Sequence, residues 1–223
     1  MSGWLALVGG AEWTPGCDID AELIAGAGGA GVEVLVLPTA AAFERPELAV
    51  ATATAWLTPM GARVTGLYVL NRADAHDPAN IAAVRSAGFV YLSGGSPLHL
   101  RAVLKQTPLW DALVAAHNDG AVLAGSSAGA MVLGDPMVDP RGGAYTLGLG
   151  LVANLAVLPH ADTWSPEKVH RTLKLAPAGV AVALVGERAA LVRAPDGTWS
   201  SRGQVTVQGR TGEIALSAIS PSD

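Results

Sequence analysis

A short turn rich in glycine and serine is the segment best suited to chemistry. Residues 125–129, GSSAG, fit the pattern G-x-S-x-G with Ser127 at the centre. An apolar run, AVLA, leads into the turn, and a helix-compatible run, AGAMVL, leads out of it. A nucleophile elbow needs this strand–turn–helix setting, and its small neighbours avoid clashes around a strained backbone. We therefore predict a nucleophile at Ser127. Ser126 is the rival, and the alternative is a turn that only packs a helix on a sheet.

A nucleophilic serine needs a base, for which histidine is the usual residue. His160 follows the apolar run LAVLP, at the carboxyl end of an expected strand, and is therefore the best of the five histidines. His76 lies in a polar loop, and His170 lies in the charged helical segment EKVHR. His99 and His117 fall within helical stretches, where a surface position is expected.

The third member of a triad is a carboxylate that orients the imidazole and stabilises its cation. Glu187 lies between two apolar runs, VAVALVG and AALV, and is the preferred acid. Asp135 and Asp139 are rivals, because they lie between Ser127 and His160 in the chain. A solvated hairpin turn at Glu187 is the structural alternative.

A second glycine turn, Ser93-Gly94-Gly95-Ser96-Pro97, ends another apolar run. Paired glycines let backbone N–H groups approach a ligand closely. We expect the Gly95 and Ala128 N–H groups to bind an oxyanion, and Gly94 and Ser96 to contact substrate. An ordinary strand-to-helix turn is the alternative.

Strand-like and helical stretches alternate over the first two thirds of the chain. Strands are expected at residues 5–8, 32–37, 63–70, 89–92 and 121–124, and helices at 18–29, 46–57, 78–87, 98–105 and 108–118. This order predicts an α/β fold with a mainly parallel sheet flanked by helices, and ligands then gather at the carboxyl ends of the strands. The last third, including Pro195-Asp196-Gly197, predicts antiparallel hairpins appended to that sheet.

Composition narrows the class of protein. The 223 residues suit one domain, residues 1–223, and are half apolar with a net charge of −5. We find no basic stripe for nucleic acid, no membrane segment, and no residue spacing typical of a metal or nucleotide cofactor site. Cys17 is the single cysteine, which favours a reducing, cytoplasmic location.

The motifs resemble peptidase family S51, which includes dipeptidase E and cyanophycinase and has a fold like class I glutamine amidotransferases and flavodoxin. The resemblance rests on GSSAGA (125–130), YLSGG (91–95), PH (159–160), GERAALV (186–192) and LALVGGAE (5–12). It implies a Ser127 nucleophile, a His160 base, a Glu187 acid and an oxyanion loop at the glycine pair. Ser96-Pro97 replaces a polar run of the family, and residues 161–164, ADTW, replace an aromatic and arginine-rich one. The catalytic machinery therefore transfers better than the specificity.

These observations predict a serine hydrolase that cleaves a small peptide or isopeptide amide through an acyl-enzyme, without a metal or cofactor. A homodimer is suggested by the resemblance alone. Two alternatives stay open, an esterase of the α/β-hydrolase type using Asp139 and an inactive small-ligand binding protein. A glutamine amidotransferase is disfavoured, because its elbow carries cysteine.

Overall fold

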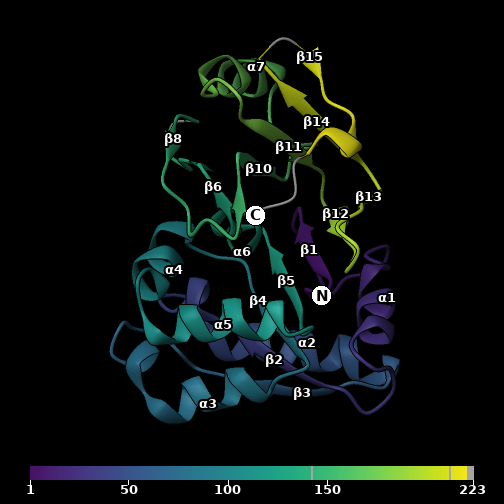
Figure 1. Cartoon of the computed structure of the whole chain (residues 1–223), viewed down its shortest axis with the longest axis vertical. Coiled ribbons are helices and arrows are strands. Elements are labelled where there is room, and N and C mark those ends of the chain that lie inside the picture. Colours follow the sequence, from purple (N-terminus) through teal and green to yellow (C-terminus); the bar gives the residue numbers. More distant parts are fainter. Residues whose placement is uncertain (142, 211, 220–223) are drawn as a thin grey trace.

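The computed structural model describes residues 1–141, 143–210 and 212–219, and Figure 1 shows its two β-sheets and the helices around them. The larger sheet has seven strands in the order β13-β12-β1-β5-β4-β2-β3. These strands are β1 (Leu5–Val8), β2 (Glu33–Leu37), β3 (Arg63–Gly66), β4 (Phe89–Leu92), β5 (Val122–Ser126), β12 (Ala190–Arg193) and β13 (Trp199–Arg202).

Strands β1 to β5 of this sheet are parallel to one another, as the alternation of strands and helices predicted. β12 runs antiparallel to β1, and β13 antiparallel to β12, so the predicted hairpin extends the sheet at one edge. Its turn is closed by two hydrogen bonds between Ala194 and the Gly197–Thr198 pair, each 2.9 Å long. The Asp-Gly signal was therefore correct, because Gly197 takes the positive φ of 86° that glycine tolerates.

Helices flank both sheets, and in Figure 1 most of them lie in the lower part of the picture, around the larger sheet. They are α1 (Ile19–Gly26), α2 (Pro46–Leu57), α3 (Pro78–Ser86), α4 (Pro97–Leu104), α5 (Pro108–Asn118), α6 (Ala128–Leu133) and α7 (Pro166–Leu175), with 3₁₀ turns at Thr39–Ala41, Thr58–Met60, Asp74–His76 and Leu216–Ala218. Proline begins five of the helices at a position where its missing N–H costs nothing. Side-chain oxygens of Asp77, Ser96, Thr107 and Ser165 cap four of these.

The second sheet was not predicted as a separate unit. Its order is β15-β14-β11-β10-β6-β9, with β6 (Gly134–Asp135), β9 (Val152–Ala153), β10 (Leu155–Pro159), β11 (Ala181–Val185), β14 (Val205–Gly209) and β15 (Gly212–Glu213). β10 and β11 are parallel, so the run at 181–185 is not part of a simple appended hairpin. β7 (Met137–Val138) pairs with β8 (Tyr145–Thr146) as a small ribbon. The short strands at 134–153 are too brief to leave a periodic signal.

One apolar core joins the two sheets. It contains Leu5 and Leu7 of β1, Leu133 of α6, and Val157 and Val182 of the second sheet, all fully buried. α6 contacts β5 on one side and β10 on the other. The two sheets are therefore held in a fixed relation, which places the carboxyl end of β5 beside that of β10. A second core fills the other face of the larger sheet around Val36, Leu57 and Phe89.

Candidate active site

Ser127 lies on a strained turn between β5 and α6. Its backbone has φ 48° and ψ −106°, a conformation that residues other than glycine rarely adopt. The Ser127 N–H donates to the Val8 oxygen over 2.9 Å, and its carbonyl accepts from the Met131 N–H over 2.9 Å. A methyl group at Gly129 would lie 2.3 Å from the Leu92 oxygen. Small residues are therefore needed around Ser127, as the motif predicted.

His160 reaches Ser127 from the second sheet. It follows β10, and its Nε2 lies 3.0 Å from Ser127 Oγ. The His160 N–H donates to the Gly9 oxygen over 2.8 Å, which ties the end of β10 to the turn after β1. A methyl group at Gly10 would lie 2.1 Å from Cε1 of the imidazole. Glycine at this position is therefore what makes room for the ring.

Glu187 completes the row of three side chains. Its Oε1 lies 3.0 Å from Nδ1 of His160, so Nδ1–H donates to the carboxylate and Nε2 is free to accept the Ser127 proton. The Glu187 N–H donates to Asp162 Oδ1 over 3.0 Å, so Asp162 fixes the turn that carries the acid. The His160 and Glu187 side chains are about one third exposed, at 34% and 31%. The pair is therefore accessible from solvent.

Neither rival carboxylate touches His160. Asp135 Oδ1 accepts a hydrogen bond from the Gly148 N–H over 2.8 Å. Asp139 forms a two-point contact with the Arg141 guanidinium at 2.9 and 2.6 Å. This contact lowers the pKa of Asp139 to about 2. Both aspartates are therefore committed to local loop structure, and the geometry favours Glu187 as the acid.

The second glycine turn lies against the nucleophile, since a methyl group at Gly94 would be 3.6 Å from Ser127 Cβ. Gly95 has φ +133°, and a methyl group there would lie 2.4 Å from the Ala40 oxygen. Within the described chain, the Gly95 N–H makes no hydrogen bond, and Ala128 is the first residue of α6, where N–H groups lack helical partners. The predicted oxyanion donors therefore flank Ser127. The Ser96 hydroxyl is used differently, accepting from the His99 N–H as the cap of α4.

Glu12 is a site residue that sequence reasoning missed. Its Oε2 accepts from Ser126 Oγ over 2.7 Å, and its Oε1 accepts from the Gly94 N–H over 3.3 Å. The flanking residues Ala11 and Trp13 both have positive φ, at 50° and 58°. One carboxylate thus joins the nucleophile turn to the glycine-pair turn. Its sequence signal is a charge two residues after Gly10, at the end of the LALVGGAE motif, and such a charge looks the same in a solvated loop.

The remaining candidates lie elsewhere. His117 is buried rather than at the surface, because its imidazole packs beside Arg193 of β12. His99 Nε2 contacts the Leu70 oxygen at 2.9 Å. Cys17 is also buried, and burial raises the pKa of its thiol to about 12. It is therefore not an activated nucleophile.

Two features of other classes of protein are absent from the described residues. No helix among residues 1–141, 143–210 and 212–219 has both the length and the apolar content that a membrane crossing requires. In the same residues, three or more His, Cys, Asp or Glu side chains do not gather into a metal-binding group.

Fold and site together define an α/β protein with a strained serine turn and an adjoining His–Glu pair. The model of peptidase family S51 matches residues 5–197. The chain belongs to this family, so the resemblance read from the motifs is confirmed.

Similar proteins of known sequence or structure agree with this assignment. A peptidase from an acI-B1 actinobacterium superimposes with a TM-score of 0.84 at 31% identity, covering 96% of this chain and 93% of that one. A putative peptidase E from Listeria monocytogenes shares the fold, with a TM-score of 0.64, 19% identity, and coverage of 94% and 99%. Cyanophycinases from Synechococcus elongatus and Thermosynechococcus vestitus are each 34% identical over 114 residues. That match spans 49% of this chain and 35% of either cyanophycinase.

Proposed function

We propose that the protein is a serine peptidase that cleaves a short peptide or isopeptide amide through an acyl-enzyme. The observation that carries the proposal is the continuous row from Ser127 Oγ through the imidazole to Glu187, with both contacts at 3.0 Å. Membership of family S51 supports the same class of reaction.

In the proposed mechanism, Ser127 Oγ attacks the amide carbonyl carbon while His160 Nε2 accepts its proton. Glu187 holds the resulting imidazolium and stabilises its charge. The Gly95 and Ala128 N–H groups donate to the oxyanion. His160 then protonates the leaving amine, the C–N bond breaks, and water releases the acyl group by the same steps.

A short substrate is favoured by the space around the site. A cavity of about 320 Å³ lies beside the glycine-pair turn, next to rather than around the triad: Glu12, Trp13, Arg45 and Gly94 line it among others, and Ser127, His160 and Glu187 do not. This volume suits a residue or two rather than a folded protein. Both acidic and basic side chains line the cavity, namely Glu12, Glu44 and Arg45. A charged or zwitterionic peptide end therefore fits better than an apolar one.

The alternatives are weaker for specific reasons. An esterase of the α/β-hydrolase type would use Asp139, whose carboxylate is held by Arg141. A glutamine amidotransferase would need cysteine at residue 127. An inactive binding protein would have no need for the Ser127–His160–Glu187 row, nor for the backbone strain at Ser127.

The first test is labelling of the purified protein with a fluorophosphonate probe. We expect labelling of the wild type and its loss in Ser127→Ala and His160→Ala, because both the nucleophile and its base are needed. Ser126→Ala is the matched control, since it removes the neighbouring hydroxyl: it should keep the label, slowed by no more than about tenfold because the tie to Glu12 is lost. Labelling of folded Ser127→Ala, or an unlabelled folded wild type that also resists smaller sulfonyl fluorides, would overturn the proposal.

The second test is a screen for hydrolysis of short peptides, including isopeptides, by the wild type and Ser127→Ala. Release of amino acids by the wild type alone would establish the substrate class. Cleavage of esters but of no peptide in the library would instead favour the esterase.

A further inference from the structure

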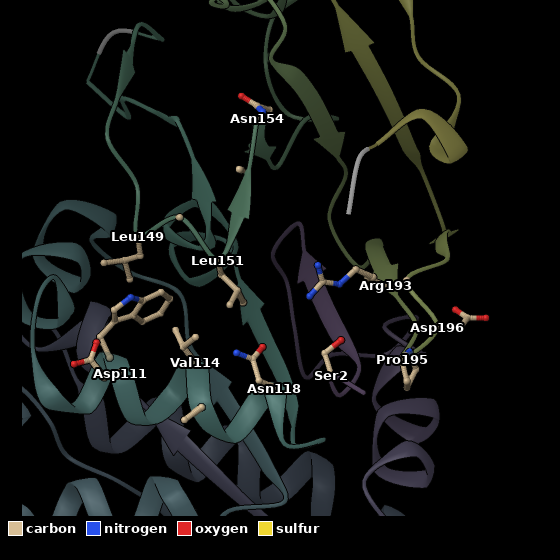
Figure 2. A pocket seen from close by; sticks show the side chains of 15 residues that line it. Ser2, Asp111, Val114, Asn118, Leu149, Leu151, Asn154, Arg193, Pro195 and Asp196 are labelled. Atoms are coloured by element: carbon tan, nitrogen blue, oxygen red, sulfur yellow. The ribbon is translucent and has the colours of Figure 1, made fainter. Parts of the chain in front are cut away.

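A larger cavity of about 1110 Å³ lies away from the candidate active site. It is formed by α5, the segment 149–154 and the end of β12, as Figure 2 shows. None of Ser127, His160 and Glu187 lines it. Arg193 pairs with Leu5 at the start of β1, whereas Ser126 pairs with Val8 at its end. Three residues along β1 separate these positions by about 10 Å. The cavity therefore opens near the end of the β1 strand opposite to the one that carries the candidate active site.

Arg193 is a buried cation at this cavity. Its side chain points into the space in Figure 2, although the residue is only 7% exposed. Nη2 donates to Nε2 of His117 over 3.0 Å, and the guanidinium carbon lies 5.7 Å from the centre of the Trp199 ring. Nε is buried and has no hydrogen-bond partner among the described residues.

No anion neutralises Arg193 within the described chain, where its guanidinium forms no ion pair with a carboxylate. His117 is neutral, because burial lowers its pKa to about 4 and the Arg193 charge acts in the same direction. Its Nδ1–H donates to the Ala121 oxygen over 3.2 Å, which leaves Nε2 as an acceptor. A buried charge without a counter-ion is costly, and a carboxylate bound to a guanidinium removes that cost.

The cavity walls define the rest of the ligand. Trp110, Val114 and Leu149 supply apolar surface, and Ser2 and Asn118 supply polar groups near Arg193. Asp111 and Asp196 also line the cavity, and their negative charges disfavour a polyanion such as a phosphate monoester. One guanidinium facing an apolar wall is suited to a single carboxylate on an apolar body.

We propose that this cavity is a second ligand site, which binds a small monocarboxylate with its carboxylate on Arg193 and its apolar part against Trp110 and Val114. The site is separate from the proposed peptidase centre, so its occupancy does not depend on Ser127.

Isothermal titration calorimetry with phenylacetate tests the proposal on the full chain. We expect equal affinities in the wild type and Ser127→Ala, and binding at least about tenfold weaker for the uncharged phenylacetamide. Arg193→Gln should weaken phenylacetate binding by a similar factor. Ala115→Trp should block it, because residue 115 lines the cavity from an exposed position on α5, whereas the matched variant Ala115→Ser should bind normally.

Four results would overturn the proposal. They are no binding to the folded wild type at millimolar phenylacetate, unchanged binding in Arg193→Gln, tighter binding of phenyl phosphate than of phenylacetate, and loss of binding when Ser127 is labelled. If Arg193→Gln does not fold, the comparison of phenylacetate binding by Ala115→Trp and Ala115→Ser tests the proposal instead, and equal binding by the two variants would overturn it. Loss of peptidase activity in Ser127→Ala with intact phenylacetate binding keeps the two proposals distinguishable.

Discussion

At the scale of single residues, Ser127 carries a positive φ in the midst of a fully buried strand and helix. Backbone strain of this kind costs on the order of 1–3 kcal/mol and persists only where the surroundings enforce it. Here the Val8 oxygen and the close approach of Gly129 to Leu92 enforce it. The strain directs Oγ toward His160 rather than into the core.

Replacement of Glu187 by glutamine tests the acid. We expect Glu187→Gln to slow fluorophosphonate labelling by about 10²-fold or more, because an amide stabilises the wrong imidazole tautomer and no longer offsets the imidazolium charge. The rate of labelling of the folded protein is the measurement.

Asp139→Asn is the matched control for this experiment. It should label at the wild-type rate, because Asp139 contacts Arg141 and not the imidazole. A slow Asp139→Asn together with a normal Glu187→Gln would move the acid to Asp139.

The residues brought together at the site could largely be found from the sequence, because each one follows an apolar run that forms a buried strand, although these strands belong to two different sheets. Ser127, His160 and Glu187 all fit this rule. Glu12 escaped it, because its importance comes from two hydrogen bonds to residues more than eighty positions away. The burial of His117 also escaped, because a polar residue in an amphipathic helix gives no sign of the cation that faces it.

At the scale of elements, the turn after β1 links the two catalytic loops through Glu12. We expect Glu12→Ala to lower kcat by about tenfold with little change in KM, because loss of the ties to Ser126 and Gly94 loosens the relation of nucleophile and oxyanion donors. Steady-state kinetics on a cleaved peptide measures this effect.

Two variants separate a positioning role for Glu12 from a simple charge effect. Glu12→Gln keeps an acceptor for the Gly94 N–H and should recover most of kcat. Glu44→Gln removes a charge from the same cavity and should leave kcat unchanged. A Glu12→Gln variant as slow as Glu12→Ala would contradict the positioning role.

α1 and α2 are joined by a buried carboxyl group that makes stability depend on pH. Asp20 Oδ2 accepts from Trp56 Nε1 over 2.9 Å, and Oδ1 has no partner among the described residues. Burial raises the pKa of Asp20 to about 7. The folded state therefore binds a proton that the unfolded chain releases near pH 4, and the stability this group confers is lost as pH rises toward 7.

Asp20→Asn should remove that loss. We expect the variant to gain stability relative to the wild type between pH 5 and pH 8, by on the order of a few kcal/mol, since asparagine stays neutral and still accepts from Trp56. Urea unfolding at both pH values measures the difference. A constant difference between variant and wild type would show that Asp20 does not titrate in this range.

The elements themselves were predictable where the sequence marks their ends. The spans of α2, α5 and β4 agree with the prediction to the residue, because proline or an apolar block marks their ends. The strand expected over residues 63–70 ends at Gly66. The second sheet was missed because pairing between β10 and β11 is a tertiary choice, which an apolar run alone does not specify.

At the scale of the whole molecule, the two sheets share one core through α6. Leu133 is fully buried at the end of this helix. We expect Leu133→Ala to destabilise the protein by about 2–5 kcal/mol through the cavity it leaves. Because the core is continuous, circular dichroism and loss of labelling should follow the same urea transition.

A difference between the urea transitions measured by circular dichroism and by labelling would contradict the single core. If labelling were lost at a lower urea concentration than the secondary structure, the second sheet would be unfolding separately from the first. The conservative variant Leu133→Met should keep the free energy of unfolding within about 1.5 kcal/mol of the wild-type value.

The division of the site between the sheets also has a consequence during translation. The elbow is complete once residues 1–133 have left the ribosome, but its base and acid follow only with β10 and the turn at Glu187. A nascent or prematurely ended chain therefore presents a serine with no partner to ionise it. We therefore expect a chain that ends after residue 133 to resist fluorophosphonate labelling, because it lacks the proposed base and acid.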